Sequence, residues 1–529
     1  MSQTTDRAAD QIPESPPAAG GADVPAPVAG VAGAAHAAAD ATAVVGTTVA
    51  DTTAVADVTA VPRAASRVGN KTALLVIACV AQFMVVLDVS IVNVALPAMR
   101  DSLGLSTTGV QWVVNAYALG FAGLLLFGGR AADLFGAKPV FLTGLIGFTV
   151  ASFAGGMADT GGLLIAARAV QGLAGAVLAP ATMTLIMTTF LEPRERTRAL
   201  GVWSATMAAG GAMGAVVGGM LTQWASWRWV LFVNVPIGAA LVLAAVPLIA
   251  RTRGRGATTL RTLDLPGAIT VTLGLTGVVY GVVTTDTHSW GSSAVLVPIA
   301  AGAALLALFV LIEARSAHAL VPLRVFRNRS LAVADVAAVL IGAGMFAMWF
   351  YVSLYLQQVL GFDALQAGFS FIPGSAMIVA GTAVATRALG RIGPRPLLLA
   401  GPLLAAAGLA WLSRFPADGG YATDVLGPLM LLTFGMGLAM TPLAVAGTAG
   451  MPRHEAGLAS GLINTSRQVG GAIGLAGLST VSAHVASSHG GSLKAAQAAG
   501  FGGAMLGAAL LLAAAAVVAT LLPRRGTAG

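Results

Sequence analysis

The sequence predicts an all-α integral membrane protein with fourteen membrane-spanning helices, and three observations carry this prediction. Of the 529 residues, 57% are hydrophobic and only 9% are charged, whereas a soluble globular protein carries roughly 25% charged residues. The mean hydropathy is +0.84. After about residue 70, apolar runs follow one another, each near the roughly 20 residues that a helix needs to cross a bilayer. We therefore exclude a water-soluble enzyme.

Residues 1–70 have a different character and are rich in Ala, Pro, Val and Thr. They include seven acidic residues and no apolar run long enough to cross a membrane. A signal peptide would need a basic stretch followed by an apolar stretch of about 7–15 residues, and this segment has neither. Because such a composition cannot bury a core, we expect a disordered cytoplasmic tail.

The apolar runs begin at Ala73 and define the order of the spans. The single cysteine, Cys79, lies in the first run, so neither an intrachain disulfide nor a cysteine metal site can form. We expect fourteen spans, at residues 73–97, 110–129, 140–158, 162–190, 201–223, 229–250, 265–283, 293–313, 331–356, 366–386, 396–412, 424–446, 457–482 and 501–522.

The basic residues predict the orientation of these spans. With both termini in the cytoplasm, 23 of the 29 Lys and Arg residues lie on the cytoplasmic side. Two others, Arg168 and Arg467, lie within spans. This bias follows the positive-inside rule, and it accounts for the net charge of +8 without any nucleic-acid partner. We expect a multi-pass protein of the cytoplasmic membrane.

Two groups of residues repeat at an offset of 257 to 260 positions. The loop after the second span contains Arg130 and Gly136, which recur as Arg387 and Gly393. The glycines of the fifth span recur in the thirteenth, where Gly201, Gly210, Gly211 and Gly214 correspond to Gly461, Gly470, Gly471 and Gly474. The chain therefore contains two copies of one six-helix unit.

This repeat predicts the domain organisation. Two parallel six-helix repeats with a substrate path at their interface are a transporter architecture. We expect a tail at 1–70, an N-terminal six-helix bundle at 71–250, two inserted membrane helices with flanking loops at 251–329, and a C-terminal six-helix bundle at 330–529.

Several ordered motifs carry a family resemblance. The first span ends in Leu87–Pro97, the fourth contains Arg168 and Gln171, and Trp227–Pro236 follows the fifth. The loop between the second and third spans contains Gly129, Arg130, Asp133, Gly136 and Lys138. The fifth span contains Gly201, Gly210, Gly214, Gly218 and Gly219. Over about residues 72–525 the chain resembles the major facilitator superfamily, and specifically its fourteen-span drug:proton antiporters.

The resemblance assigns roles to these motifs. It implies a gating loop between the second and third spans, with Ala137 where a basic residue is usual. It implies a proton-coupling arginine at Arg168. It also implies a helix-packing motif in the fifth span, with Ala215 in place of the expected proline.

A charged side chain inside a membrane span costs free energy, so charged residues in the spans are candidates for proton or substrate sites. Asp88 is the first candidate, because an ionised carboxylate in an apolar helix is expensive. The alternative is a permanent hydrogen bond to a neighbouring helix. Asp335, near the start of the ninth span, is a second candidate unless it lies at the membrane interface. Arg168 cannot deprotonate, so it acts on a partner carboxylate or an anion, or else extends toward the headgroups.

The roles of the gating loop and of the glycines can also be argued from physical principles, without the resemblance. Arg130 and Asp133 are three residues apart near a helix end, so they can pair with charges or helix ends of the other repeat. The alternative is a solvated loop that only sets topology. The glycines of the fifth span let two helices approach closely, either for packing alone or for a leak-proof contact between the repeats.

An aromatic and amide stretch near the end of the ninth span is a possible drug pocket, formed by Trp349, Tyr351, Tyr355 and Gln357. The alternative is an aromatic belt at the membrane interface. The chain contains no phosphate-binding loop of the G-x-x-x-x-G-K-[ST] type, and its histidines lack metal-ligand spacing. We expect no cofactor, no metal site and no enzyme activity.

Together these features predict a proton-coupled antiporter that exports amphipathic or hydrophobic drugs, antibiotics or secondary metabolites by alternating access. The expected partners are a small-molecule substrate, protons and the lipid bilayer, and the expected state is a monomer. Two alternatives stay open, a nutrient importer and an integral-membrane enzyme. An enzyme would need converging nucleophiles, bases or metal ligands, and the sequence contains no such group.

Overall fold

The computed structural model describes residues 71–249, 264–285, 287–316, 319–452 and 455–523. Within these ranges the chain is helical and has no strand. The expected tail at 1–70 lies outside the described residues. The helices are α1 (Lys71–Leu103), α2 (Thr107–Phe135), α3 (Ala137–Gly156), α4 (Gly161–Thr189), α5 (Pro193–Trp224), α6 (Trp229–Phe232), α7 (Asn234–Leu248), α8 (Leu265–Thr284), α9 (Ser293–Arg315), α10 (Arg329–Leu354), α11 (Ala364–Ser370), α12 (Ile372–Ile392), α13 (Pro394–Leu412), α14 (Leu426–Thr448), α15 (Ala456–Ser488) and α16 (Leu493–Ala519).

The lengths and apolarity of these helices confirm the all-α membrane fold. Among the described residues, 13 helices are long and apolar enough to cross a membrane. The fourteenth span is α5, if its two parts, Arg194–Gly211 and Met213–Trp224, form one span across a bend of 41°. Four other spans are assembled from shorter pieces: α6 with α7, α11 with α12, α10 with the π-helix Tyr355–Val359, and α14 with the π-helix Tyr421–Val425.

The two repeats turn at corresponding glycines. Gly136 separates α2 from α3 with a φ angle of 92°, and Gly393 separates α12 from α13 with a φ angle of 79°. These left-handed angles carry a steric penalty for residues with a Cβ. Each glycine therefore ends one helix and lets the next begin immediately, at corresponding positions of the two repeats.

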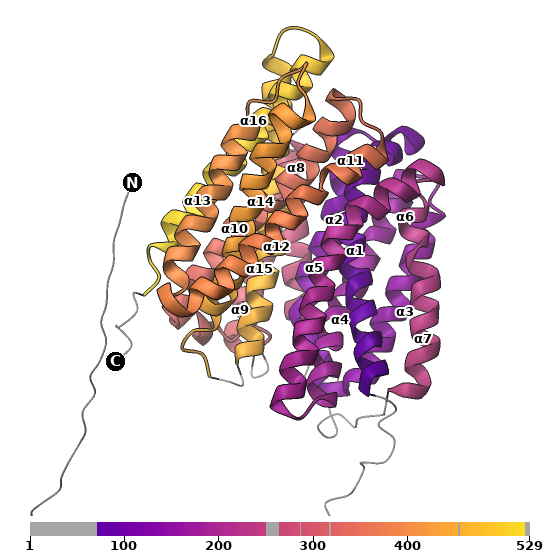
Figure 1. Ribbon diagram of the computed structural model, residues 1–529, viewed down its shortest axis with the longest axis vertical. Coiled ribbons are helices and arrows are strands. Elements are labelled where there is room, and N and C mark those ends of the chain that lie inside the picture. The colour runs from indigo at the N-terminus through magenta and orange to yellow at the C-terminus, as the bar shows by residue number, and fades with distance from the viewer. Residues whose placement is uncertain (1–70, 250–263, 286, 317–318, 453–454, 524–529) are drawn as a thin grey trace, which may run out of the picture. The chain divides into compact units, whose positions relative to one another are not determined.

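The helices of the two halves pack in the same pairs (Figure 1). In the N-terminal half, α1 packs on α5, α2 on α4, and α3 on both α4 and α7. In the C-terminal half, α10 packs on α15, α12 on α14, and α13 on both α14 and α16. This recurrence is what two copies of one unit would produce, while the domain boundaries themselves stay a prediction.

The inserted helices α8 and α9 pack on each other. α8 also contacts α2 of the N-terminal half and α15 of the C-terminal half, so it bridges the two halves. Most of α9 is exposed, with only 11% of its most apolar stretch buried. An apolar helix with so little buried surface is suited to face lipid.

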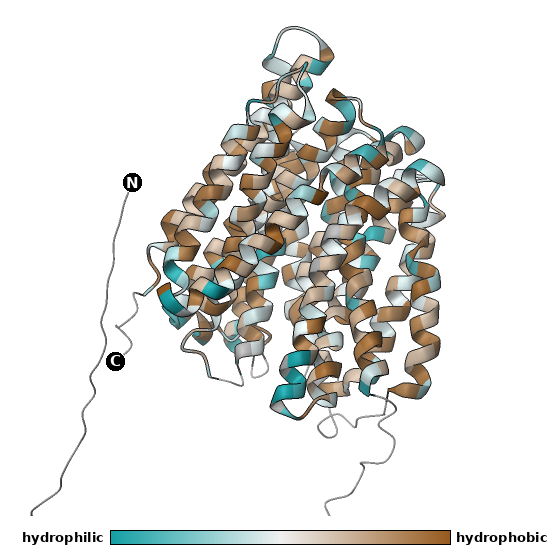
Figure 2. Cartoon of the chain, in the orientation of Figure 1, coloured by the Kyte–Doolittle hydropathy of each residue, from teal (hydrophilic) through white to brown (hydrophobic). Residues whose placement is uncertain are grey.

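Hydrophobic residues occupy much of the length of the helices (Figure 2), and many large apolar side chains are exposed. Val150, Leu243, Leu510 and Val517 are each more than 60% exposed. In water such a surface would aggregate, whereas in a bilayer it is solvated by acyl chains. The exposed apolar surface therefore agrees with a protein that is embedded in a membrane.

Candidate functional site

Asp88 of α1 lies at the centre of a buried polar cluster. Its side chain has 0% exposure and accepts hydrogen bonds from three residues. Arg168 Nη1 of α4 donates to Oδ2 at 2.5 Å. Gln171 Nε2 of α4 and Asn234 Nδ2 of α7 donate to Oδ1 at 2.7 Å and 3.0 Å. Three elements that lie far apart in the sequence therefore converge on one carboxylate.

Arg168 is fixed from several sides. It is only 2% exposed, so it does not extend toward the headgroups. Its Nε donates to the carbonyl oxygen of Val113 at 3.3 Å, and its Nη1 also donates to Gln171 Oε1 at 2.7 Å. The guanidinium carbon lies 4.3 Å from the centre of the Tyr117 ring, a cation–π contact. Arg168 and Gln171 reach the same carboxylate because residues three apart share a helix face.

The cluster contains one negative and one positive charge. A buried ion pair is tolerated only with good geometry and further hydrogen bonds. The two amides supply those bonds, and Ser152 accepts another from Gln171 at 2.8 Å. Two buried polar atoms of the cluster, Tyr117 Oη and Asn234 Oδ1, have no hydrogen-bond partner within the described ranges. The arrangement can therefore hold an ionised carboxylate and still offers an unused acceptor.

Asp335 of α10 does not join this cluster. It is 7% exposed, and its Oδ1 accepts a hydrogen bond from Ser466 of α15 at 3.1 Å. Its Oδ2 has no partner among the described residues. The two acidic candidates therefore lie in separate halves and have separate surroundings.

The gating loop contacts other segments through its basic residues. Arg130 Nη1 donates to the carbonyl oxygen of Ala319 at 2.9 Å. Ala319 lies after the inserted helices, so this contact reaches the inserted segment and not the expected charges of the second repeat. Glu313, near the end of α9, is close enough to Arg130 and Asp264 for electrostatic interaction. The side chain of Asp133 lies outside the described residues.

Lys138 and Gly129 complete this loop. Lys138 Nζ donates to the carbonyl oxygens of Val246 and Ile249 at 2.6 Å and 2.7 Å. These carbonyls end α7, where a cation complements the helix dipole. This contact stays within the N-terminal half. A Cβ atom added at Gly129 would lie 3.8 Å from the Cβ atom of Pro180 in α4, an ordinary contact distance.

The glycines of α5 face two different helices. Gly210, Gly214 and Gly218 lie against α1, and a Cβ on Gly218 would lie 2.6 Å from the carbonyl oxygen of Ile91. Gly219 faces the carbonyl of Ala364 in α11, which belongs to the other half. Gly201 has nothing within 4 Å. The motif therefore forms one contact within the half and one contact between the halves.

The residues predicted as a possible drug pocket, in α10 and in the π-helix Tyr355–Val359 that follows it, pack against several different elements. Tyr355 is 0% exposed, stacks on Phe415 at 3.8 Å between ring centres, and donates to the carbonyl oxygen of Pro416. Tyr351 is 2% exposed and packs against Phe501. Because these tyrosines are buried, they do not form a lipid-facing belt.

Trp349 and Gln357 point elsewhere. The Trp349 ring lies 4.7 Å from that of Phe371. Gln357 Nε2 donates to the carbonyl oxygen of Val94 at 3.1 Å, so it joins α1 to the C-terminal half.

Sequence reasoning missed three members of the Asp88 cluster: Asn234, Tyr117 and Ser152. Asn234 begins α7 and is fully buried. A polar amide inside an apolar run was the available signal, because a polar group in a span needs a partner. Tyr117 gave no comparable signal, since an aromatic residue in a span is ordinary.

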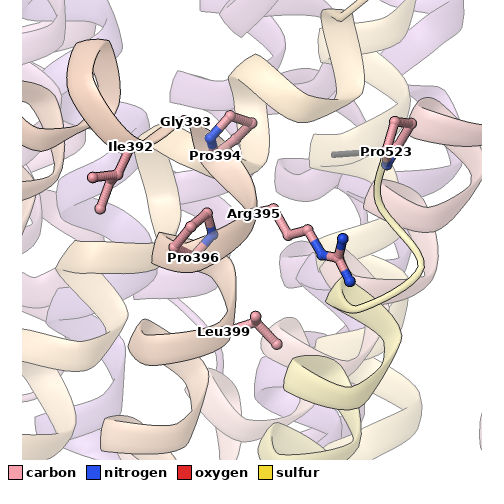
Figure 3. A pocket seen from close by; sticks show the side chains of 7 residues that line it. All are labelled: Ile392, Gly393, Pro394, Arg395, Pro396, Leu399 and Pro523. Carbon is pink, nitrogen blue, oxygen red and sulfur yellow. The ribbon is translucent and has the colours of Figure 1, made fainter. Parts of the chain in front are cut away.

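Two pockets of the described chain lie away from this cluster. One pocket of about 380 Å³ is lined by the ends of α12, α13 and α16, including Gly393, Arg395 and Pro523 (Figure 3). A second, of about 350 Å³, lies beside Arg324 and Glu455. The part of the chain that the structure describes has no group of three or more His, Cys, Asp or Glu residues that could hold a metal ion.

Comparison with known proteins identifies the family. The family model of the Major Facilitator Superfamily matches residues 78–475. The cephamycin export protein CmcT of Amycolatopsis lactamdurans is 46% identical, over 79% of this chain and 86% of its own length. The puromycin resistance protein pur8 of Streptomyces alboniger is 40% identical, over 77% of this chain and 81% of its own length. The lincomycin resistance protein of Streptomyces lincolnensis is 34% identical, over 78% and 84%.

A solved structure agrees on the fold. A bacterial homologue of the human lysosomal transporter Spinster, in an inward-facing and unoccupied conformation, matches with a TM-score of 0.60. The match covers 85% of this chain and 97% of that chain, at 16% sequence identity. At this identity the likeness concerns the fold alone.

Proposed function

This chain belongs to the Major Facilitator Superfamily, and from that premise we propose that it is a proton-coupled antiporter that exports drugs or antibiotics. The substrates would be amphipathic or hydrophobic compounds, including secondary metabolites. Export would cross the cytoplasmic membrane by alternating access, in which the two halves open the path to one side at a time.

Part of this statement follows directly from the family. The chain is a multi-pass membrane transporter of a small-molecule substrate and not an enzyme. The assignment of drug efflux is supported by the relatives, whose names describe cephamycin export and resistance to puromycin and lincomycin. Proton coupling and its direction belong to our proposal.

The observation that carries the coupling proposal is the ion pair of Asp88 and Arg168. Both side chains are almost completely buried, and they face each other at 2.5 Å. An exporter without a nucleotide site needs a group that takes up a proton in one access state and releases it in the other. Asp88 is suited to this role because its charge is balanced by one arginine whose own charge is permanent.

The proton step changes the bonds of the cluster in a defined way. Uptake of one proton converts the Asp88 carboxylate to the neutral acid and removes its attraction to Arg168. The new O–H needs an acceptor, and the unpaired Oδ1 of Asn234 supplies one if the amide turns over. Arg168 keeps its bonds to Gln171 and to the carbonyl of Val113. Release of the proton on the other side of the membrane restores the ion pair.

Contacts between the halves support alternating access. Ser353 Oγ donates to the carbonyl oxygen of Asn93 at 3.0 Å, and Gln357 donates to that of Val94. The first bond joins α10 to the second half of α1, and the second joins the short π-helix Tyr355–Val359, which continues α10, to the same part of α1. The packing of α5 on α11 joins the halves as well. With both termini in the cytoplasm, as the basic residues predict, these contacts close the outer side of the path.

The proposal also includes the surroundings of the protein. The lipid bilayer would solvate the apolar surface, and the protein would act as a monomer with both termini in the cytoplasm. Asp335 would be a second, independent site for a proton or a cationic substrate in the C-terminal half. The pocket role of Trp349, Tyr351, Tyr355 and Gln357 is not included, because these side chains point in different directions.

A transport assay tests the coupling. The full chain, reconstituted in liposomes with an imposed pH gradient, should move ethidium or puromycin against its concentration gradient. Asp88→Asn should insert and fold, because asparagine mimics the neutral acid that the proposed cycle itself passes through, and it should lose pH-gradient-driven transport, since an amide cannot take up or release a proton. Asp101→Asn, at an exposed residue of the same helix, is the matched control and should transport normally.

Other outcomes would change the assignment. If Asp88→Asn spares neutral drugs and loses only cationic ones, Asp88 binds substrate and does not couple protons. If it pumps every compound at the wild-type rate, the coupling role of Asp88 is refuted. The wider proposal fails if drug-sensitive cells that express the chain gain no resistance across a panel including puromycin, lincomycin and a cephamycin.

A further inference from the structure

The two arginines within the spans have different surroundings. Arg168 is paired with Asp88. Arg467 lies on α15, eleven residues after Ala456 and therefore about 16 Å along the helix axis. It takes part in none of the ion pairs of the described chain. Because a guanidinium always keeps its charge, the C-terminal half holds a permanent positive charge that forms no ion pair with an acid among the described residues.

The bonds of Arg467 leave much of this charge uncompensated. Its Nη2 donates to Asn464 Oδ1 at 2.7 Å, and its Nη1 lies 3.4 Å from Met440 Sδ of α14. A neutral amide oxygen and a thioether sulfur carry no charge, and the sulfur is a weak acceptor. The buried Nε has no partner in the described ranges. Of the five N–H donors of a guanidinium, some are therefore free for another acceptor.

Asp335, the acid on the neighbouring helix α10, forms its hydrogen bond with another residue of α15. Asp335 accepts its hydrogen bond from Ser466, the residue just before Arg467. Successive residues of a helix point about 100° apart, so Asp335 engages a different face of α15. Arg467 instead extends to Asn464 and across to α14. The positive charge of Arg467 is thus available to a ligand that α14 and α15 would both contact.

We propose that Arg467, together with Asn464, binds the carboxylate of an anionic or zwitterionic substrate. An unneutralised arginine inside a membrane span is costly, and such residues mark substrate and ion pathways. A carboxylate would neutralise the charge and accept two parallel N–H bonds from the planar guanidinium. Met440 is flexible and polarisable, so it can adapt to different apolar bodies attached to that carboxylate. This inference rests on the proposed function, because the ligand is taken to be the transported molecule.

Two dyes that differ only at a carboxylate test whether the protein recognises this group. Rhodamine B carries a free carboxylate, and its ethyl ester differs only in that this group is neutral. Equilibrium binding of each dye to the purified full-length protein is measured by fluorescence polarisation, without any ion gradient. Wild-type protein should bind rhodamine B about tenfold or more tightly than the ester, as expected for a charge-assisted hydrogen bond.

Three variants sharpen the test. Arg467→Gln should lower the preference for the acid to about one, because the amide keeps polarity and loses charge. Arg467→Lys should retain part of the preference, since a lysine is a point charge without the planar fork. Arg414→Gln, at an exposed arginine outside the spans, should retain all of it.

Several results would overturn this inference. One is wild-type protein that binds the acid no more tightly than the ester. Another is Arg467→Gln protein that weakens both dyes equally while keeping its thermal stability. A third is displacement of rhodamine B by phosphatidylglycerol at stoichiometric amounts, which would make the anion a lipid headgroup. Failure of the proposed function is a separate result, because binding can be selective for the carboxylate even if pH-driven transport is absent.

Discussion

Replacement of Gly219 by alanine should weaken the contact between the two halves. Gly219 of α5 faces the carbonyl oxygen of Ala364 in α11, and Gly368 of α11 faces the carbonyl oxygen of Ala215 in α5. Each helix thus presents a glycine to the backbone of the other. An added Cβ at Gly219 would lie well inside the 3.0 Å that real Cβ atoms keep from other heavy atoms. The atom it meets is backbone, so no side chain can simply rotate away.

The size of the effect follows from this overlap. The helices must separate until the carbon and oxygen reach their ordinary distance of roughly 3.3–3.6 Å. Overpacking of this kind costs about 1–3 kcal/mol. If the cost acts only in the state where α5 and α11 touch, the equilibrium shifts about 5- to 150-fold toward the state in which they separate. Transport should slow, because one of the two access states becomes poorly populated.

The assay measures the distance between the halves directly. Spin labels at Gln223, near the end of α5, and at Ser488, at the end of α15, report on opposite halves at exposed positions. The single cysteine Cys79 is replaced beforehand. In Gly219→Ala protein the distribution of label distances should move to longer values, measured by pulsed electron spin resonance.

A matched control separates this effect from a general loss of helix flexibility. Gly201→Ala adds the same methyl group to the same helix at a position with nothing within 4 Å. It should leave both the distances and the transport rate unchanged, or stabilise the protein slightly. The reasoning is refuted if Gly219→Ala and Gly201→Ala give the same distance distribution and the same rate.

Three further predictions concern other parts of the chain. Lys138→Met removes two bonds to the carbonyls that end α7, so it should lower the free energy of unfolding by about 1–3 kcal/mol in a denaturant titration. Lys494→Met, at an exposed lysine, should change nothing, and equal stabilities would contradict the capping role. A cysteine at His288 should react with an impermeant thiol reagent from outside the cell, and one at Gly254 should not; labelling at 254 would overturn the topology. Deletion of residues 2–60 should leave insertion and efflux intact, and lost efflux at normal expression would show that the tail is required.

Much of the fold could be predicted from the sequence because it depends on local properties. A run of about 20 apolar residues has to become a helix in a bilayer, since every backbone group needs an internal partner there. The turn glycines Gly136 and Gly393 follow a similar local rule, because their positive φ angles suit a residue without a side chain. The bend in α5 was not predictable in this way, because the pattern contains the small residue Ala215 where a proline was expected.

The candidate site was predictable only in part. Asp88 and Arg168 stood out because charge is rare and costly inside a span, which is a property of each residue alone. That Gln171 and Asn234 bind the Asp88 carboxylate depends on how three helices, α1, α4 and α7, pack together. Asn234 is 146 positions from Asp88. The residues next to Asn234 in the sequence therefore do not indicate that Asp88 is its partner. The aromatic residues of α10 illustrate the same limit, since neighbours in sequence point into different contacts once the helix is packed.

By itself, then, the sequence determined the membrane class, the order of the helices, the repeat and the few charged groups in the spans. Hydropathy, glycine content and charge act over one or two helical turns, so they can be read from a short window. Only the tertiary structure decided that Arg168 is neutralised by Asp88, while Arg467 forms no ion pair within the described ranges. Both arginines stand in similar apolar runs, and what distinguishes them is the side chain that a distant helix brings into reach.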